Sequence, residues 1–290
     1  MVTNNQVCFT TDYNFDLYED KVIPILDSQG CVRKCEFCDI IEHWQAYTWK
    51  KASNTFDEML YQSKKHGIYR FSMRNSLTNG NMIEFRNWIE LIAQYNKTAD
   101  SNKQFSWLGY FNVRKAQAHP EEMWQKIADS NGTLILGVES VIEKIRWQMG
   151  KKFTNDDVDY HLEMGKKYNV PLVFLMMASS PGETLQDFEY TKQWFKDRVK
   201  YAGSSVSAVF YALASILPGT AWEKLKDTDI QLGPTIFIWS DKNNPLTHKQ
   251  RIDYLEELIK ICEPYNQQST LDYNEQGYDT KQMLSYQYDD

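Results

Sequence analysis

Six short apolar runs, separated by segments with helical spacing, limit the folds open to this chain. The runs are rich in β-branched and aromatic residues, which favour strands over helices at such lengths. They occupy 22–27, 68–73, 105–111, 133–139, 170–178 and 205–213. Strands that alternate with helices predict an α/β fold with a parallel sheet and right-handed crossovers, either open and doubly wound or curled as a barrel. The 290 residues fit the size range of one α/β barrel.

Helix-start signals precede the amphipathic segments. A polar side chain that accepts from free N–H groups, or a proline at the first position, marks where a helix begins. The sequence predicts helices at 54–66 behind Asn54 or Thr55, at 82–95 behind Asn81, from Pro120 onward, at 155–168 behind Thr154 with Asp157 as capping-box partner, at about 183–200, and at 247–262 behind Thr247. His119, directly before Pro120, is expected to act as a cap, and Cys262 to lie in the core.

The pattern divides the chain into three parts. We expect an N-terminal extension at 1–20, a core barrel at 21–225 and a C-terminal extension at 226–290. The C-terminal extension holds one predicted helix and a polar, acidic tail from 265, which is expected to be flexible or to lie over the surface. We expect this extension to cover part of the barrel mouth.

Five positions with polar or turn-forming residues come directly after predicted strands. They are Cys31, Gly80, Glu139, Pro181 and Pro218. Because the carboxyl ends of parallel strands meet at one edge of the sheet, where ligands bind in α/β folds, these residues are expected to converge on one rim.

Charge and hydropathy disfavour two classes of partner. The formal net charge of −7 leaves no basic surface for a phosphate backbone, so nucleic acid is a disfavoured partner. The longest apolar run, 170–178, is far shorter than the roughly 18 residues that a membrane helix needs. The first residues lack the basic start and apolar stretch of a secretory signal. We therefore expect a cytoplasmic protein without membrane contact.

Three of the five cysteines stand close together, at Cys31, Cys35 and Cys38. This number of cysteines does not make a disulfide framework in a chain of this size, so metal binding is the first interpretation. A structural zinc site is closed by four ligands, and His43 is a nearby candidate for the fourth. A four-iron cluster also normally takes four cysteines, and three would leave one iron open. Three incidental thiols are a further interpretation.

Four motifs in order resemble those of the radical SAM superfamily. They are "CVRKCEFC" at 31–38, "LGVES" at 136–140, "PGET" at 181–184 and "LPGTAW" at 217–222, each at a predicted strand end. The likeness spans about residues 20–225 and is greatest to the core of cobalamin-type members. The resemblance implies a partial (β/α)6 TIM-like barrel with a small C-terminal extension.

The resemblance also implies a chemistry. In this family three cysteines bind a [4Fe–4S] cluster, and S-adenosylmethionine chelates the remaining open iron. An electron from the cluster cleaves S-adenosylmethionine to a 5′-deoxyadenosyl radical, which abstracts hydrogen from the substrate. By this resemblance Cys31, Cys35 and Cys38 are the cluster ligands, and the substrate is a small molecule or a peptide. Electrons are expected from an external donor such as a flavodoxin or a ferredoxin.

Contacts to S-adenosylmethionine follow from the same resemblance. The backbone around Phe37 is expected near the adenine, and Glu139 at the ribose or the methionine end. Asn75 and Arg114 are candidates at the turns after the second and third strands. Ser179 stands where related proteins often have a glycine, and is a candidate hydrogen-bond partner. Arg74 stands where relatives often have an acidic residue, and a basic side chain cannot accept from an ammonium group.

Features that the chain lacks narrow the function further. Only 30 residues precede Cys31, too few for a cobalamin-binding domain, and Cys8 and Cys262 do not suffice for a second cysteine-ligated cluster. The sequence therefore predicts a minimal radical SAM enzyme of unassigned reaction. Three alternatives stay open: a non-catalytic iron–sulfur or zinc protein closed by His43, a cobalamin-type methyltransferase core that needs a partner chain, and a relative that binds S-adenosylmethionine without turnover.

Overall fold

The computed structural model describes residues 14–266, except 19, 45, 200–202, 228 and 243–245. Within these residues one sheet has six strands in the order β1-β4-β5-β6-β7-β8, and every neighbouring pair is parallel. Their bounds are β1 Ile23–Ile25, β4 Arg70–Met73, β5 Ser106–Phe111, β6 Gly132–Glu139, β7 Leu172–Ala178 and β8 Val206–Leu213. The six predicted strands and the α/β partial barrel are confirmed.

Helices connect successive strands, as a parallel sheet requires. They are α2 Ala52–His66, α3 Met82–Thr98, α4 Glu121–Asp129, α5 Glu143–Gln148, α6 Asn155–Tyr168 and α7 Leu185–Trp194. The short helix α1 Ile40–His43 follows the first strand, and α9 His248–Asn266 follows the last. Two small antiparallel ladders pair β2 Ser28–Gln29 with β3 Thr48–Trp49, and β9 Ile230–Leu232 with β10 Trp239–Asp241.

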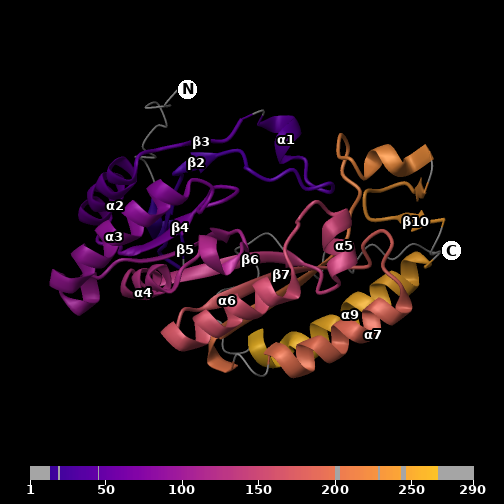
Figure 1. Cartoon of the computed structure of the whole chain (residues 1–290). Helices are drawn as coiled ribbons and strands as arrows, with labels where there is room; N and C mark the ends of the chain where they lie inside the picture. The colour runs from indigo at the N-terminus through magenta and orange to yellow at the C-terminus, as the bar shows by residue number, and fades with distance from the viewer. Residues whose placement is uncertain are drawn as a thin grey trace.

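The helices cover the outer side of the sheet. Figure 1 shows α2, α3 and α4 at the left of the view, and α6, α7 and α9 along its lower side. Helices α7 and α9 pack together, with the rings of Phe188 and Tyr254 stacked 4.2 Å apart between centroids. Leu255, Leu258 and Cys262 of α9 are buried in the main core, which confirms the prediction for Cys262.

Three of the predicted helix starts are confirmed. The Asn81 carboxamide oxygen accepts from the N–H groups of Ile83 and Glu84 at the start of α3. Thr154 and Asp157 form a reciprocal capping box at the start of α6. The Thr247 hydroxyl accepts from the Gln250 N–H (3.2 Å) directly before α9. Local side-chain chemistry decides all three starts, so the sequence is sufficient to predict them.

Three predictions about helix starts are wrong. Helix α2 begins at Ala52 rather than behind Asn54 or Thr55, because the Ala52 N–H donates to the carboxylate of Glu84 on α3 (2.7 Å). Pro120 is the residue before α4 rather than its first residue. His119 does not cap α4.

The His119 ring is instead buried. Its Nδ1 lies 2.9 Å from Nε2 of His161, and its Nε2 lies 3.2 Å from the Asn79 amide nitrogen. Long-range partners of this kind leave no local pattern in the sequence.

The remaining predicted segments differ in length. Helix α7 ends at Trp194 and continues as a π-helical turn, Phe195–Val199, and α9 extends four residues beyond 262. Helices α1 and α5 and both small ladders are too short to show a period. The predicted polar tail begins at 265, but Tyr265 and Asn266 belong to α9, so this bound is wrong. The residues from 267 onward and the first 13 residues lie outside the described residues. None of the described helices is both long enough and apolar enough to cross a membrane.

Candidate functional site

A cavity of about 550 Å³ opens at the carboxyl ends of the parallel strands. Its walls include Cys31, Cys35 and Cys38, together with Tyr110 of β5, Glu139 at the end of β6, Met177 of β7 and Leu213 of β8. The predicted convergence on one rim is therefore observed for the cysteines and Glu139. This is the position at which parallel α/β sheets bind ligands.

The cysteines lie on residues 30–39, which we call the cysteine loop. Gly30 has φ +76° and an added Cβ would lie 2.6 Å from the Ala46 oxygen, so a side chain does not fit there. The Glu36 N–H donates to the Met149 oxygen (3.0 Å), and the Trp222 N–H donates to the Glu36 oxygen (3.1 Å). The loop is thus held by two segments that are distant in sequence.

The three thiols are free and partly exposed. Burial raises the pKa of Cys35 to about 11, and the nearby Lys151 ammonium opposes that shift. Burial also raises the pKa of Cys38. Metals bind thiolates and displace their protons, and iron–sulfur clusters take thiolate ligands. Three free thiols on one loop beside an open cavity are a donor set that fits a [4Fe–4S] cluster.

A zinc site closed by His43 does not form in the described residues. The His43 Nε2 atom lies 3.3 Å from a carboxylate oxygen of Asp39, and 67% of the side chain is exposed. Within 14–266, apart from the gaps, no three His, Cys, Asp or Glu residues converge on a point where one metal ion would be held. Thiolates that bind different irons of one cluster need not converge in this way.

Glu139 is held in a strained backbone conformation beside the cysteine loop. Its φ is +65°, which is uncommon for a residue other than glycine and clusters at functional sites. The Lys151 ammonium donates to the Glu139 carboxylate (2.7 Å) and to the Gly137 oxygen (2.6 Å). A Cβ at Gly137 would lie 2.8 Å from the carboxylate and 2.9 Å from the ammonium, so glycine makes room for this pair.

Phe37 lies between this ion pair and the turn after β8. The Lys151 nitrogen is 5.6 Å from the centroid of the Phe37 ring, and the ring of Trp222 is 5.5 Å from it on another side. Phe37 and Glu139 therefore line the same cavity as the cysteines.

Asn75 lies outside the residues that line this cavity. Its amide nitrogen donates to the carboxylate of Asp27, and its oxygen accepts from the Thr78 hydroxyl (3.2 Å). Burial raises the pKa of Asp27 to about 6. The side chain of Asn75 is thus engaged on both sides.

Arg114 and Ser179 also lie outside the cavity lining. Arg114 donates to the Asn79 oxygen (3.3 Å), and its Nε is buried without a partner in the described residues. Ser179 has φ +60° and lines a separate, much smaller cavity with Glu183 and Arg251. Its hydroxyl is also buried without a partner there.

Two basic residues of the site were missed in the sequence. Arg33 and Lys151 both line the cavity, and Arg33 donates to the Lys151 oxygen (3.4 Å) and the Val113 oxygen (3.3 Å). Arg33 lies inside the motif "CVRKCEFC", but nothing in the motif marks it as a cavity residue, and Lys151 belongs to no motif. The partners of Arg33 are 80 and 118 residues away, and those of Lys151 are Gly137 and Glu139 of β6. Only the folded chain brings them together.

The segment after β8 supplies part of the cavity wall. Ile236 and Phe237 line it together with the cysteine loop. The lining also contains the apolar residues Leu175, Phe210 and Leu217. Ile236 and Phe237 belong to the predicted C-terminal extension, and its role as a cover of the barrel mouth stays a prediction.

Comparison with known proteins places the chain among related sequences and folds. The family model described as the Radical SAM superfamily matches residues 25–195. No curated protein matches the chain. The fold resembles that of TsrM from Kitasatospora setae, a radical S-adenosylmethionine methyltransferase whose structure contains cobalamin and a [4Fe–4S] cluster. The TM-score is 0.61 at 14% identity, over 82% of this chain and 43% of TsrM.

A second similar structure is OxsB, a cobalamin-dependent S-adenosylmethionine radical enzyme with aqua-cobalamin and S-adenosylmethionine bound. The TM-score is 0.63 at 12% identity, over 83% of this chain and 41% of OxsB. This chain therefore matches less than half the length of either protein. At these identities the likeness shows a shared barrel fold.

Proposed function

Because this chain belongs to the radical SAM superfamily and is an enzyme of that class, we propose that Cys31, Cys35 and Cys38 bind a [4Fe–4S] cluster and that the adjoining cavity binds S-adenosylmethionine and a substrate. The observation that carries the proposal is the position of three free thiols and Glu139 in one cavity at the carboxyl ends of the strands. Bound there, the cluster and S-adenosylmethionine supply the radical that removes a hydrogen atom from the substrate.

The chain's own residues hold and shape this site. The cysteine loop would supply three thiolates to the cluster, and S-adenosylmethionine would bind the iron that has no protein ligand. Lys151 and Glu139 form an ion pair that lines the cavity beside Phe37. The apolar part of the cavity wall, which includes Phe237, would limit the access of water to a radical, which needs protection from side reactions. This wall suits a small molecule or a peptide side chain as substrate.

Two further contacts to S-adenosylmethionine are part of the proposal. Arg114 and Ser179 lie outside the cavity lining, but each has a buried polar atom without a partner in the described residues, which supports a role as donors to a ligand. Asn75 is hydrogen-bonded on both sides, so its contribution is to hold Asp27 at the end of β1. An external electron donor, such as a flavodoxin or a ferredoxin, completes the proposed system.

The test is anaerobic reconstitution with iron and sulfide, followed by reductant and S-adenosylmethionine. We expect about four irons per chain, an absorbance typical of an iron–sulfur cluster, and formation of 5′-deoxyadenosine. Cys35→Ala should lose both the cluster and the product. Cys262→Ala, which removes a buried core thiol outside the cavity lining, should retain both. Retention of a single zinc without iron, or an intact cluster that yields no 5′-deoxyadenosine, would contradict the proposal.

A further inference from the structure

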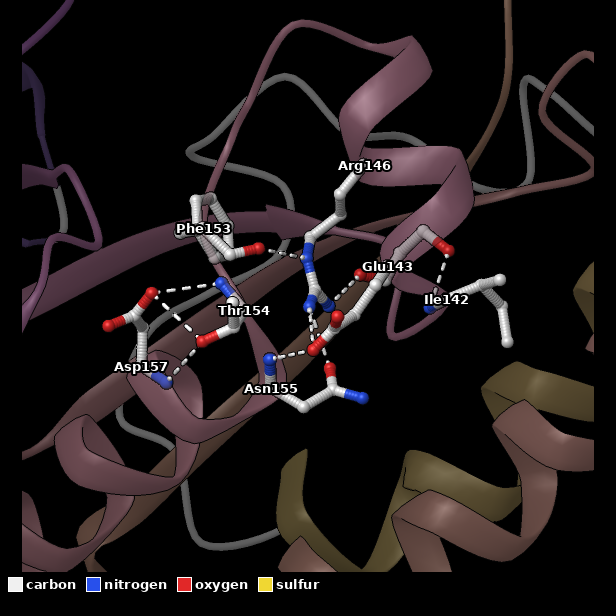
Figure 2. Close-up of polar contacts among 8 residues, drawn as sticks. Ile142, Glu143, Arg146, Phe153, Thr154, Asn155 and Asp157 are labelled. Atoms are coloured by element: carbon white, nitrogen blue, oxygen red, sulfur yellow. Dashed lines mark hydrogen bonds and ion pairs between the residues drawn. The ribbon is translucent and has the colours of Figure 1, made fainter.

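Arg146 is a fully buried cation that lies behind the cavity. Its side chain has no exposed surface. The guanidinium donates through Nε to the Phe153 oxygen (3.2 Å), through Nη1 to the Ser140 oxygen (2.7 Å) and through Nη2 to the Asn155 side chain (2.7 Å). Glu143 supplies the countercharge, 3.8 Å away. Figure 2 shows Glu143, Phe153 and Asn155 around the guanidinium. The Ser140 oxygen approaches it from directly after β6.

The contacts of Arg146 tie the connection from α5 to α6 to the end of β6. Ser140 directly follows Glu139, whereas Phe153 lies near the end of this connection and Asn155 is the first residue of α6. We call residues 149–153 of this connection the backing segment. The Lys151 N–H also donates to the Arg146 oxygen (2.9 Å), so backbone and side chain of Arg146 both hold the segment.

The backing segment contacts the cysteine loop directly. The Met149 oxygen accepts from the Glu36 N–H (3.0 Å), and the Lys151 oxygen accepts from the Arg33 guanidinium (3.4 Å). Together these bonds hold the loop on both sides of Cys35.

Gly150 is the point of closest approach. Its φ is +77°, and an added Cβ would lie 2.7 Å from the Lys34 oxygen and 3.6 Å from Cα of Cys35. The backbone of the backing segment therefore lies against the backbone of the cysteine loop, without a side chain between them.

We infer that Arg146 is a positioning residue for the cysteine loop: it fixes the backing segment, and this segment holds Cys35 in the geometry that binds the cluster. The inference rests on the proposed function, in which the loop must hold three thiolates at once to bind the cluster. A planar guanidinium with donors in three directions suits this task, whereas an ammonium cannot reach three acceptors placed around a plane.

The first test replaces Arg146 and compares a second buried arginine. Arg146→Lys and Arg146→Gln are measured beside Arg251→Lys. Arg251 is equally buried, and donates to backbone oxygens of Ala214, Phe237 and Trp239, none of which belongs to the backing segment or the cysteine loop. All three variants lose hydrogen bonds of a buried arginine, so all should unfold at lower urea concentration. Measurements below are made well under every unfolding midpoint.

The rate of alkylation of Cys35 in the metal-free full-length chain measures how often the cysteine loop opens. We expect iodoacetamide to modify Cys35 about tenfold faster in both Arg146 variants, because the loop opens more often, and at the wild-type rate in Arg251→Lys. After reconstitution, the Arg146 variants should retain at most about half of the wild-type iron and show an altered electron paramagnetic resonance spectrum with S-adenosylmethionine. Arg251→Lys should keep the wild-type iron content.

The second test perturbs the same contact without touching Arg146. Gly150→Ala and Gly67→Ala place a Cβ on glycines of similar positive φ, +77° and +67°, so their backbone strain is comparable. Only the Cβ at position 150 meets the cysteine loop, since nothing lies within 4 Å of a Cβ at position 67. Gly150→Ala should reproduce the faster alkylation and the loss of iron, and Gly67→Ala should show neither.

Equal alkylation rates of Cys35 in wild type, Arg146→Lys and Gly150→Ala would overturn the inference, as would equal effects of Arg146→Lys and Arg251→Lys. The proposed function fails separately, if the wild-type chain itself takes up no iron. In that case the alkylation rates of the metal-free chain still decide whether Arg146 positions the loop.

Discussion

Lys151 contacts several of the groups around Glu139 that line or border the cavity. Its ammonium contacts the Glu139 carboxylate and the Gly137 oxygen and lies over the Phe37 ring. The Glu139 side chain is only 12% exposed, so water cannot replace the lysine as its partner. A buried carboxylate without a cation is costly, and the cavity edge would then rearrange.

We therefore predict that Lys151→Met weakens the binding of S-adenosylmethionine to the reconstituted enzyme by about tenfold. Isothermal titration calorimetry under anaerobic conditions measures the dissociation constant. Lys64→Met, on an exposed position of α2, is the control and should bind as wild type does. An unchanged affinity in Lys151→Met would show that the ion pair does not shape the binding site.

His119 and His161 form a buried hydrogen-bonded chain. Nδ1 of His161 lies 2.7 Å from the Asp157 oxygen, which only accepts, so that nitrogen carries a proton. Nε2 of His161 then accepts from Nδ1 of His119, and Nε2 of His119 accepts from the Asn79 amide. Each ring thus donates once and accepts once as a neutral imidazole.

Protonation of either ring would break this chain. Burial lowers the pKa of His119 to about 2, with His161, Arg114 and Arg86 adding to the shift. Burial lowers the pKa of His161 to about 4, although the hydrogen bond to the Asp157 backbone oxygen and the charge of the Asp157 carboxylate act to raise it. Because both native pKa values lie below the unfolded value of 6.5, the unfolded chain binds more protons as pH falls, and stability is lost below about pH 6.5.

We predict that acidification from pH 7 to pH 5 costs wild type about 2 kcal/mol more than it costs His161→Gln, because the variant lacks one of these rings. Urea unfolding of the metal-free chain at both pH values measures the difference. Glu183 and Asp27, whose pKa values burial raises to about 7 and about 6, act in the opposite direction, since they gain protons in the native state. Both carboxyl groups are present in wild type and in His161→Gln, so their contributions to the free energy of unfolding cancel in the comparison. Equal losses in the two chains would refute the prediction.

At the scale of elements, capping boxes fix the starts of the two helices that flank β7. Thr154 and Asp157 cap α6, and Thr184 and Asp187 cap α7. Each threonine hydroxyl accepts from an otherwise unpaired N–H, and each aspartate accepts from the threonine N–H. Thr154 ends the connection from α5 to α6, and Thr184 ends the turn after β7. Each cap therefore fixes where its segment ends and the helix begins.

Thr154→Ala and Thr184→Ala should each lower the free energy of unfolding by about 1 kcal/mol, the usual cost of a lost N-cap. Denaturation in urea at pH 7 measures this loss. Thr154→Ser and Thr184→Ser keep the hydroxyl and should recover most of the stability. A serine variant as unstable as its alanine counterpart would assign the loss to the threonine methyl group instead.

At the scale of the whole molecule, the last described helix is part of the core. Helix α9 packs on β8 and against α7, and Leu255 is fully buried in the main hydrophobic cluster. Asn266 at its end exchanges hydrogen bonds with the backbone of Val209 in β8 (2.8 and 3.0 Å). The barrel therefore does not end with its sixth strand, because α9 covers that strand's outer face.

Leu255→Ala should cost about 2–5 kcal/mol of unfolding free energy, the range for a leucine removed from a packed core. Urea unfolding followed by Trp fluorescence and by circular dichroism measures it, and both signals should change together. Ile83→Ala, at an exposed position of α3, should cost little. A loss below about 1 kcal/mol in Leu255→Ala would mean that α9 packs only loosely on the barrel.

The sequence alone determined the features that depend on neighbouring residues. Periodicity predicted the six strands, and capping side chains predicted the starts of α3, α6 and α9. The spacing of Cys31, Cys35 and Cys38 is the basis for the proposal that the cysteine loop binds metal. These features arise from side chains within a few residues of each other, so a local pattern records them.

Tertiary structure alone decided which distant groups meet. The start of α2 depends on Glu84 of another helix, and the His119 ring pairs with His161 rather than with the backbone of α4. Lys151 joins Glu139, and Arg146 supports the cysteine loop through a segment more than 110 residues away from it in sequence. Such partners meet only when the parallel sheet brings its strand ends to one edge, and no local spacing encodes that meeting.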